Sequence, residues 1–184
     1  MPQSCNAPAS LFDMSQRRIQ EINSLSCADF TSVIGPTFEH SPWIAEMTWG
    51  RKPFADLEHL HRELCETVKN AGTENHRALI RAHPDLAGRL ALAGELTKES
   101  ASEQAGAGLD RLTPDELSRF QNYNAAYQAR FSFPFVICAR LNKKDAILAG
   151  FERRLVNSPE EEIKTALEEI FKIAELRLRN LVGH

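Results

Sequence analysis

Two helix starts with the same chemistry constrain the fold of this chain most strongly. Thr113–Glu116 (TPDE) and Ser158–Glu161 (SPEE) each place a capping hydroxyl before a proline at the first helical position and a glutamate at the third. Apolar side chains then recur at helical spacing through residues 117–131 and 163–181. We therefore expect two long amphipathic helices in the C-terminal half of the chain.

The rest of the sequence shows shorter helical patterns bounded by Gly, Pro and capping residues. Only Phe133–Ala139 (FPFVICA) has the composition of a strand, and no second strand of similar quality could pair with it. We expect a buried extended segment there, whose backbone N–H groups need partners that a ligand could supply. The predicted fold is all-α: one compact bundle of about eight to ten helices over residues 15–184, after a flexible lead-in at residues 1–14.

Composition excludes several classes of function. The 184 residues carry a formal net charge of -3, which gives no broad basic surface for nucleic acid. No apolar run approaches the ~20 residues that span a bilayer, so we expect no membrane segment. The four cysteines form no CxxC pair, which favours free thiols in a reducing compartment, and the start of the chain lacks the features of a secretory signal. We expect a cytoplasmic protein.

His83 is the first candidate for chemistry. Leu79 and Ile80 precede it by four and three residues, so on a helix all three side chains share one face. Pro84 then disturbs the helix, which predicts that the imidazole lies at a helix end where it can face a cavity. Such an imidazole is a candidate acid or base. The alternative is a core histidine whose two nitrogens are both satisfied.

Arg177 and Glu103 are the other candidates. Arg177 follows Ile170 by seven residues and so lies on the apolar side of the last helix, where it needs a partner: a structural carboxylate, solvent or an anionic ligand. Ser100 and Glu103 form an S-x-x-E pattern, which by itself is typical of a capping box. The spacing of His59 and His61 suits no shared metal, and no zinc, phosphate-loop or dinucleotide motif is present. We therefore expect no metal site.

An ordered set of seven segments resembles the 2-oxo-4-hydroxy-4-carboxy-5-ureidoimidazoline (OHCU) decarboxylase family. The segments are Ser41–Trp43 (SPW), His83–Ala87 (HPDLA), Ser100–Gln104 (SASEQ), Phe120–Phe131, Phe133–Ala139, Ala149–Leu155 (AGFERRL) and Glu175–Val182 (ELRLRNLV). The resemblance covers about residues 15–182. It implies a cofactor-free, all-helical enzyme of urate degradation that decarboxylates OHCU to (S)-allantoin, commonly as a homodimer.

The resemblance also implies roles for individual residues. His83 matches the proton donor, and Glu103 is expected to assist it by hydrogen-bonding the imidazole and keeping it protonated. The positions that match substrate-binding residues are Pro84, Ser100, Ala101, Ser102, Glu103, Gln104, Phe135, Val136, Ile137, Cys138, Ala139 and Arg177. Because the ring of such a substrate can delocalise the electrons left by CO2, no metal or organic cofactor is needed.

Two alternatives from other classes remain open at this point. One is a non-catalytic helical module that binds a small anion or a partner protein. The other is a metal-dependent hydrolase that acts on a related ureide. His83 discriminates the first from a decarboxylase, because a binding module needs no titrating group in its pocket. Loss of activity on chelation, restored by a divalent ion, would indicate the second.

Overall fold

All regular elements in the described part of the chain are helical, which confirms the all-α prediction. The computed structural model describes residues 11–88, 91 and 93–182. Their elements are α1 (Leu11–Ser24), α2 (Cys27–Ile34), η1 (Gly35–Thr37), α3 (Trp43–Trp49), α4 (Leu57–Lys69), α5 (Thr73–Arg81), α7 (Lys98–Gly106), α8 (Pro114–Phe131), η2 (Ala139–Leu141), α9 (Lys144–Arg154) and α10 (Pro159–Val182). None of these helices combines the length and apolarity that crossing a bilayer requires.

Capping chemistry sets where the long helices begin. At α8 the Thr113 hydroxyl accepts the Glu116 N–H at 3.3 Å while the Glu116 carboxylate accepts the Thr113 N–H at 2.9 Å. Ser158 and Glu161 make the same pair of bonds at the start of α10. Both predicted capping boxes are therefore confirmed, and each satisfies two N–H groups that have no partner inside the helix.

Two helix starts differ from the prediction. The first helix begins at Leu11 rather than Ser15, and residues 1–10 of the predicted lead-in lie outside the described residues. The prediction that Ser100 starts a helix is wrong, because Thr97 caps α7: its hydroxyl accepts the Ser100 N–H at 3.3 Å. Ser100 and Glu103 therefore lie inside the helix and do not form a capping box.

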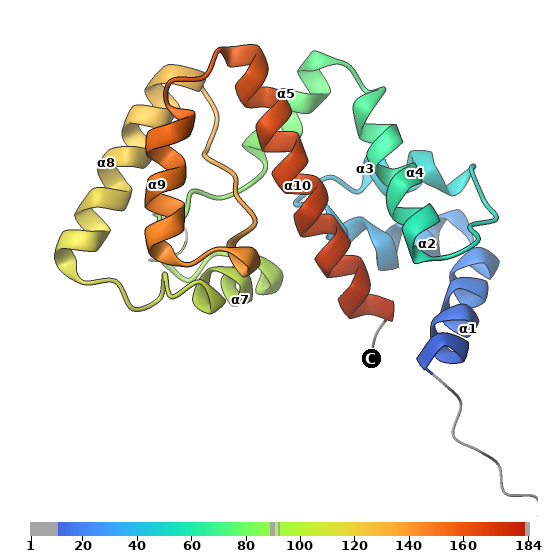
Figure 1. The fold of residues 1–184 in the computed structure, drawn as a ribbon. Coiled ribbons are helices and arrows are strands. Elements are labelled where there is room, and N and C mark those ends of the chain that lie inside the picture. The colour runs from blue at the N-terminus through green and yellow to red at the C-terminus, as the bar shows by residue number, and fades with distance from the viewer. Residues whose placement is uncertain (1–10, 89–90, 92, 183–184) are drawn as a thin grey trace, which may run out of the picture.

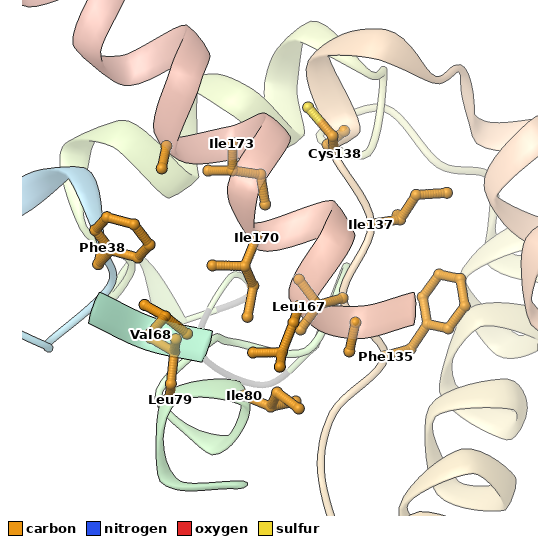
Figure 2. Close-up of a cluster of buried hydrophobic side chains, with 14 of the residues drawn as sticks. Phe38, Val68, Leu79, Ile80, Phe135, Ile137, Cys138, Leu167, Ile170 and Ile173 are labelled. Carbon is orange, nitrogen blue, oxygen red and sulfur yellow. The ribbon is translucent and has the colours of Figure 1, made fainter. Parts of the chain in front are cut away.

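Helix α10 is the central element of the molecule. It crosses the middle of the fold between α8 and α9 on one side and the N-terminal helices on the other, and it contacts α1, α4, α5 and η1 (Figure 1). In the core, its side chains at Leu167, Ile170 and Ile173 lie between Val68 and the extended segment around Phe135 (Figure 2). Each such side chain contributes about 1.5–3 kcal/mol by leaving water.

The predicted buried stripe of α10 holds over most of its length. Ile170 and Ala174 are buried, and Arg177 is buried on the same side whereas Arg179 is exposed, as the spacing predicted. Leu181 is an exception: it is 44% exposed, although the apolar spacing places it on the same face as Ile170.

Phe133–Ala139 is a buried extended segment, as predicted, and a buried arginine holds it in place. Nη1 of Arg154 donates to the Val136 carbonyl oxygen at 2.7 Å, and Nε of the same side chain donates to Glu162 Oε1 at 2.8 Å. The Tyr127 hydroxyl also donates to Glu162, whose carboxylate is fully buried. This network ties α8, α9 and α10 to the segment that lines the candidate site.

Replacing Arg154 tests that network. Arg154→Ala leaves the Glu162 carboxylate buried without a counter-charge, so the free energy of unfolding at pH 7 should fall by about 3–5 kcal/mol. Arg153→Ala, on the exposed side of the same helix, is the matched control and should change it by less than about 0.5 kcal/mol. Equal losses in the two variants, measured by urea denaturation, would show that the network does not hold the segment.

Candidate active site

Most of the predicted site residues converge from four parts of the chain on one cavity. It is bounded by the end of α5, by one face of α7, by the extended segment and by α10. Its lining residues are His83, Pro84, Leu86, Ser100, Glu103, Gln104, Phe135, Val136, Ile137, Ala139, Ile173 and Arg177. Segments nearly a hundred residues apart in sequence thus form one surface.

Three predicted positions do not line this cavity. Ser100, Glu103 and Gln104 share one face of α7 because residues three and four apart lie side by side on a helix, which turns Ala101 and Ser102 outward to exposed positions. The Cys138 side chain is buried elsewhere, and its N–H donates to Glu169 Oε2 at 2.8 Å. Leu86 and Ile173 also line the cavity, although the sequence analysis did not select them as site residues.

His83 follows directly on the end of α5, as Pro84 predicted. Its N–H donates to the Ile80 carbonyl oxygen, and its ring Nδ1 lies 2.9 Å from the Leu79 carbonyl oxygen. A carbonyl oxygen can only accept, so Nδ1 carries a hydrogen. In the neutral imidazole this leaves Nε2 with its lone pair as the nitrogen available to a molecule in the cavity.

The environment of His83 keeps the imidazole neutral. Burial lowers its pKa to about 4, because the charged ring would lose its hydration. The hydrogen bond to Leu79 and the nearby carboxylate of Glu39 act in the opposite direction and are outweighed. At neutral pH the free protein therefore presents a proton acceptor at this position, which becomes a donor only after it has gained a proton.

Arg177 is held by two carboxylates. Its Nε and Nη2 donate to the two oxygens of Glu103 at 2.9 and 2.8 Å, and its Nη1 donates to Glu39 Oε2 at 2.9 Å. The arginine is only 5% exposed. The charged partner expected for an arginine on the apolar side of α10 is therefore present. The two parallel hydrogen bonds to Glu103 fix the plane of the guanidinium.

Glu103 bonds Arg177 rather than His83. Both of its oxygens are used by the guanidinium, and no hydrogen bond to the imidazole exists in the part of the chain that is described. The expectation of a Glu103–His83 hydrogen bond is wrong for this state of the site. The Glu103 side chain nevertheless lines the cavity together with His83.

Glu39 is a buried charged residue beside Arg177 that the sequence analysis did not select. It lies in the turn after η1, where no helical or strand spacing marks its side chain as buried, although it is only 3% exposed. Burial raises its pKa, but the Thr97 hydroxyl and the Arg177 guanidinium outweigh this and hold the pKa below its usual value. The only signal in the sequence was its position two residues before the Ser41–Trp43 segment.

The remaining polar groups are arranged around these charges. Gln104 accepts the Ala87 N–H through Oε1 at 2.9 Å, which directs its amide hydrogens elsewhere. Among the described residues, the backbone N–H groups of Phe135, Val136 and Ile137 have no acceptor. Residues 135–137 line the cavity, but successive N–H groups of an extended segment point to opposite sides, so only those on the cavity side can reach a bound molecule.

The inner cavity is small and adjoins a larger one. Its free volume is about 30 Å³, enough for no more than a few water molecules. A neighbouring pocket of about 480 Å³ includes Ser102, Arg140 and Asn180, and it shares Glu103 and Arg177 with the inner cavity. The Arg177–Glu103 ion pair thus forms part of the wall between the two spaces.

The fold and the site define an all-helical protein whose inner cavity combines an imidazole, a guanidinium and an amide. That combination suits acid–base work on a small anionic molecule. No cluster of three or more His, Cys, Asp or Glu that could hold a metal ion exists among the described residues.

Comparison with known proteins gives the family. The model of the OHCU decarboxylase family matches residues 23–179. The 2-oxo-4-hydroxy-4-carboxy-5-ureidoimidazoline decarboxylase of Amia calva is 40% identical over 164 residues, which is 89% of this chain and 94% of that one. The enzyme of the same name from Haloferax volcanii is 40% identical over 90% of this chain and 96% of its own length. This chain belongs to the OHCU decarboxylase family.

A solved structure supports the same assignment. The crystal structure of (S)-allantoin synthase superposes with a TM-score of 0.68 at 27% sequence identity. The match covers 89% of this chain and 53% of that chain, so this protein spans about half of the longer one. Both the helical fold and the family are therefore shared with a structurally characterised protein.

The buried neutral state of His83 predicts how stability depends on pH. Its pKa is about 4 in the folded protein and near 6.5 in an unfolded chain, so between these values the unfolded chain binds more protons. The free energy of unfolding should therefore fall as the pH is lowered from about 6.5 to about 4. One titrating group contributes up to about 1.4 kcal/mol per pH unit to this dependence, and removing the group removes that contribution.

His83→Asn isolates this contribution, because the amide N–H of asparagine can still donate to the Leu79 carbonyl oxygen. Urea denaturation of both proteins between pH 4 and 7 measures the two slopes. The variant should lose less stability on acidification than the wild type. Parallel curves would mean that His83 is not held neutral by the fold.

Proposed function

We propose that this protein catalyses the decarboxylation of 2-oxo-4-hydroxy-4-carboxy-5-ureidoimidazoline to (S)-allantoin in urate degradation, without a cofactor. The observation that carries the proposal is the buried imidazole of His83 in one cavity with Arg177 and Gln104, in a chain of the OHCU decarboxylase family. The (S)-allantoin synthase match supports the stereochemical outcome.

The substrate chemistry explains why these groups suffice. When CO2 leaves, the electron pair of the broken C–C bond moves into the neighbouring C=N of the ring, and the ring nitrogen takes up a proton. The hydroxyl group on the carbon that lost CO2 then becomes a carbonyl group, and the neighbouring carbon gains a proton. The protein must hold the carboxylate, stabilise the electron-rich ring and deliver that last proton to one face.

Arg177 and the polar donors of the cavity are suited to binding. A guanidinium matches the geometry of a carboxylate with two parallel hydrogen bonds. The amide hydrogens of Gln104, and those acceptor-free N–H groups of residues 135–137 that face the cavity, can bind the oxygens of the ureido group and the ring. Such neutral donors favour an electron-rich ring without adding charge that would hold the product.

His83 is suited to move the proton. In the free enzyme its Nε2 carries a lone pair, so it can take the proton that the substrate hydroxyl releases and return it to the neighbouring ring carbon. After CO2 has left, the carboxylate of Glu103 in the same cavity favours the protonated state of the imidazole. His83 is thus the proton donor of the second half of the reaction, and a fixed ring delivers the proton to one face only.

The proposal extends to assembly and location. We propose a homodimer, which is what the resemblance to the family implies. We also propose a cytoplasmic location, which the four cysteines without a pairing motif support. Sedimentation velocity of the purified protein measures the first of these directly. A monomer at micromolar concentration would contradict it.

Substitution of His83 tests the proposed function. General acid–base catalysis contributes on the order of 10²–10⁴-fold, so His83→Asn should lower kcat for OHCU by at least about 100-fold in a folded protein. His76→Asn is the matched control, because the His76 ring also bonds a backbone carbonyl oxygen, that of Val68 at 2.8 Å, but lies outside the cavity. Near-wild-type turnover by His83→Asn would exclude the role assigned to this residue.

Substitution of Glu103 tests a second role in the reaction. Once a substrate carboxylate occupies Arg177, the negative charge of Glu103 can stabilise the protonated imidazole in the same cavity. Glu103→Gln removes that charge, so kcat should fall at least about tenfold, equivalent to about 1.4 kcal/mol, without a rise in KM. Glu168→Gln, at an exposed position of α10 that lines neither the inner cavity nor the larger pocket, should leave both constants near wild type. An unchanged kcat in folded Glu103→Gln would leave Glu103 with a structural role only.

A further inference from the structure

We propose that Glu39 is a positioning residue for the decarboxylation: it keeps Arg177 and the start of α7 in place while the substrate carboxylate displaces Glu103 from the guanidinium. The inference rests on the proposed function. It assigns different tasks to the two carboxylates that share Arg177, one fixed and one exchangeable.

The two carboxylates differ in what they touch. The Glu103 side chain is 12% exposed and lines both the inner cavity and the larger pocket beside it. The Glu39 side chain is 2% exposed and lines neither. A substrate that enters through the larger pocket therefore meets the Glu103 side of the guanidinium first. Glu39 borders a different pocket, of about 320 Å³, whose lining includes neither Arg177 nor Glu103.

Glu39 has partners that Glu103 lacks. Its Oε1 accepts the Thr97 hydroxyl at 2.7 Å, and its Oε2 accepts the Ser100 hydroxyl at 3.0 Å together with Arg177 Nη1 at 2.9 Å. Three donors from two elements hold one carboxylate, which makes its displacement by another anion costly. Among the described residues, the Glu103 side chain accepts hydrogen bonds from the Arg177 guanidinium alone.

These contacts also fix the helix that carries the site. Thr97 is the N-cap of α7, so the same hydroxyl that donates to Glu39 accepts the Ser100 N–H. A negative charge at a helix N-terminus is favoured by the backbone dipoles. Glu39 thereby ties the first turn of α7 to Arg177 on α10, and this sets the separation between Arg177 and the face of α7 that carries Gln104.

Charge balance explains why Arg177 needs both partners. With one guanidinium and two carboxylates the cluster carries an excess negative charge, so Glu103 is held less tightly than it would be in a simple ion pair. If the charge of Glu39 is removed, Arg177 and Glu103 become a neutral, buried, two-point pair. That pair is harder for a substrate carboxylate to open.

The test is a double-mutant cycle on KM. Glu39→Gln should raise KM for OHCU at least about tenfold, and kcat should fall by a smaller factor, because the Glu39 carboxylate also favours the protonated imidazole of His83. Adding Glu103→Gln should relieve most of that rise in KM, because the competing carboxylate is gone. Glu39→Asp, which keeps the charge on a shorter stem, should recover part of the affinity. A purely structural role for Glu39 predicts no relief in the double variant.

Further variants keep the outcome decisive. If Glu39→Gln does not fold, Thr97→Val removes one of the hydroxyl donors to Glu39 without changing any charge, and it should raise KM with kcat preserved. An unchanged KM in whichever variant folds, beside an active wild type, overturns the role of Glu39. Absence of OHCU turnover by the wild type would instead overturn the proposed function.

Discussion

The buried guanidinium of Arg177 is the interaction on which the rest of the site depends. A charge that is 95% removed from solvent persists only with close counter-charges, and here two glutamates supply them from α7 and from the turn after η1. Each of these elements carries other residues of the cavity or holds them in place. One cation therefore fixes the relative positions of three segments that are far apart in sequence.

Helix α10 places that cation in the site because both its starting residue and its buried face are determined. The capping box at Ser158 and Glu161 fixes where the helix starts, and the buried side chains of Ile170 and Ile173 fix which face meets the core. Arg177 then falls one turn beyond Ile173 on the same face, beside the end of α5 that carries His83. The chemistry of the site thus follows from ordinary helix packing.

The sequence predicted most of the fold and about the right region for the site. Capping boxes and apolar spacing located α8 and α10, because local hydrogen bonds and periodic burial leave a direct trace in the residues. The start of α7 was misplaced, since two hydroxyls, Thr97 and Ser100, compete for the cap and only tertiary contacts decide between them. Helical geometry, rather than the motif as a whole, determines that Ser102 points away from the cavity.

Glu39 could not have been predicted in the same way. Its burial depends on a turn with no periodic pattern and on partners 58 and 138 residues away in sequence. The neutral state of His83 is equally a product of tertiary burial, which no local pattern records. Both properties arise from contacts between distant parts of the chain, so only the three-dimensional structure reveals them.

The chirality of the product tests the central claim most directly. Decarboxylation in water protonates a planar carbon from either face, so it gives equal amounts of the two allantoin enantiomers. A proton delivered by the fixed ring of His83 reaches one face only. Circular dichroism of allantoin formed from OHCU with the protein should show an excess of the (S) enantiomer, and racemic product formed at an accelerated rate would contradict the account.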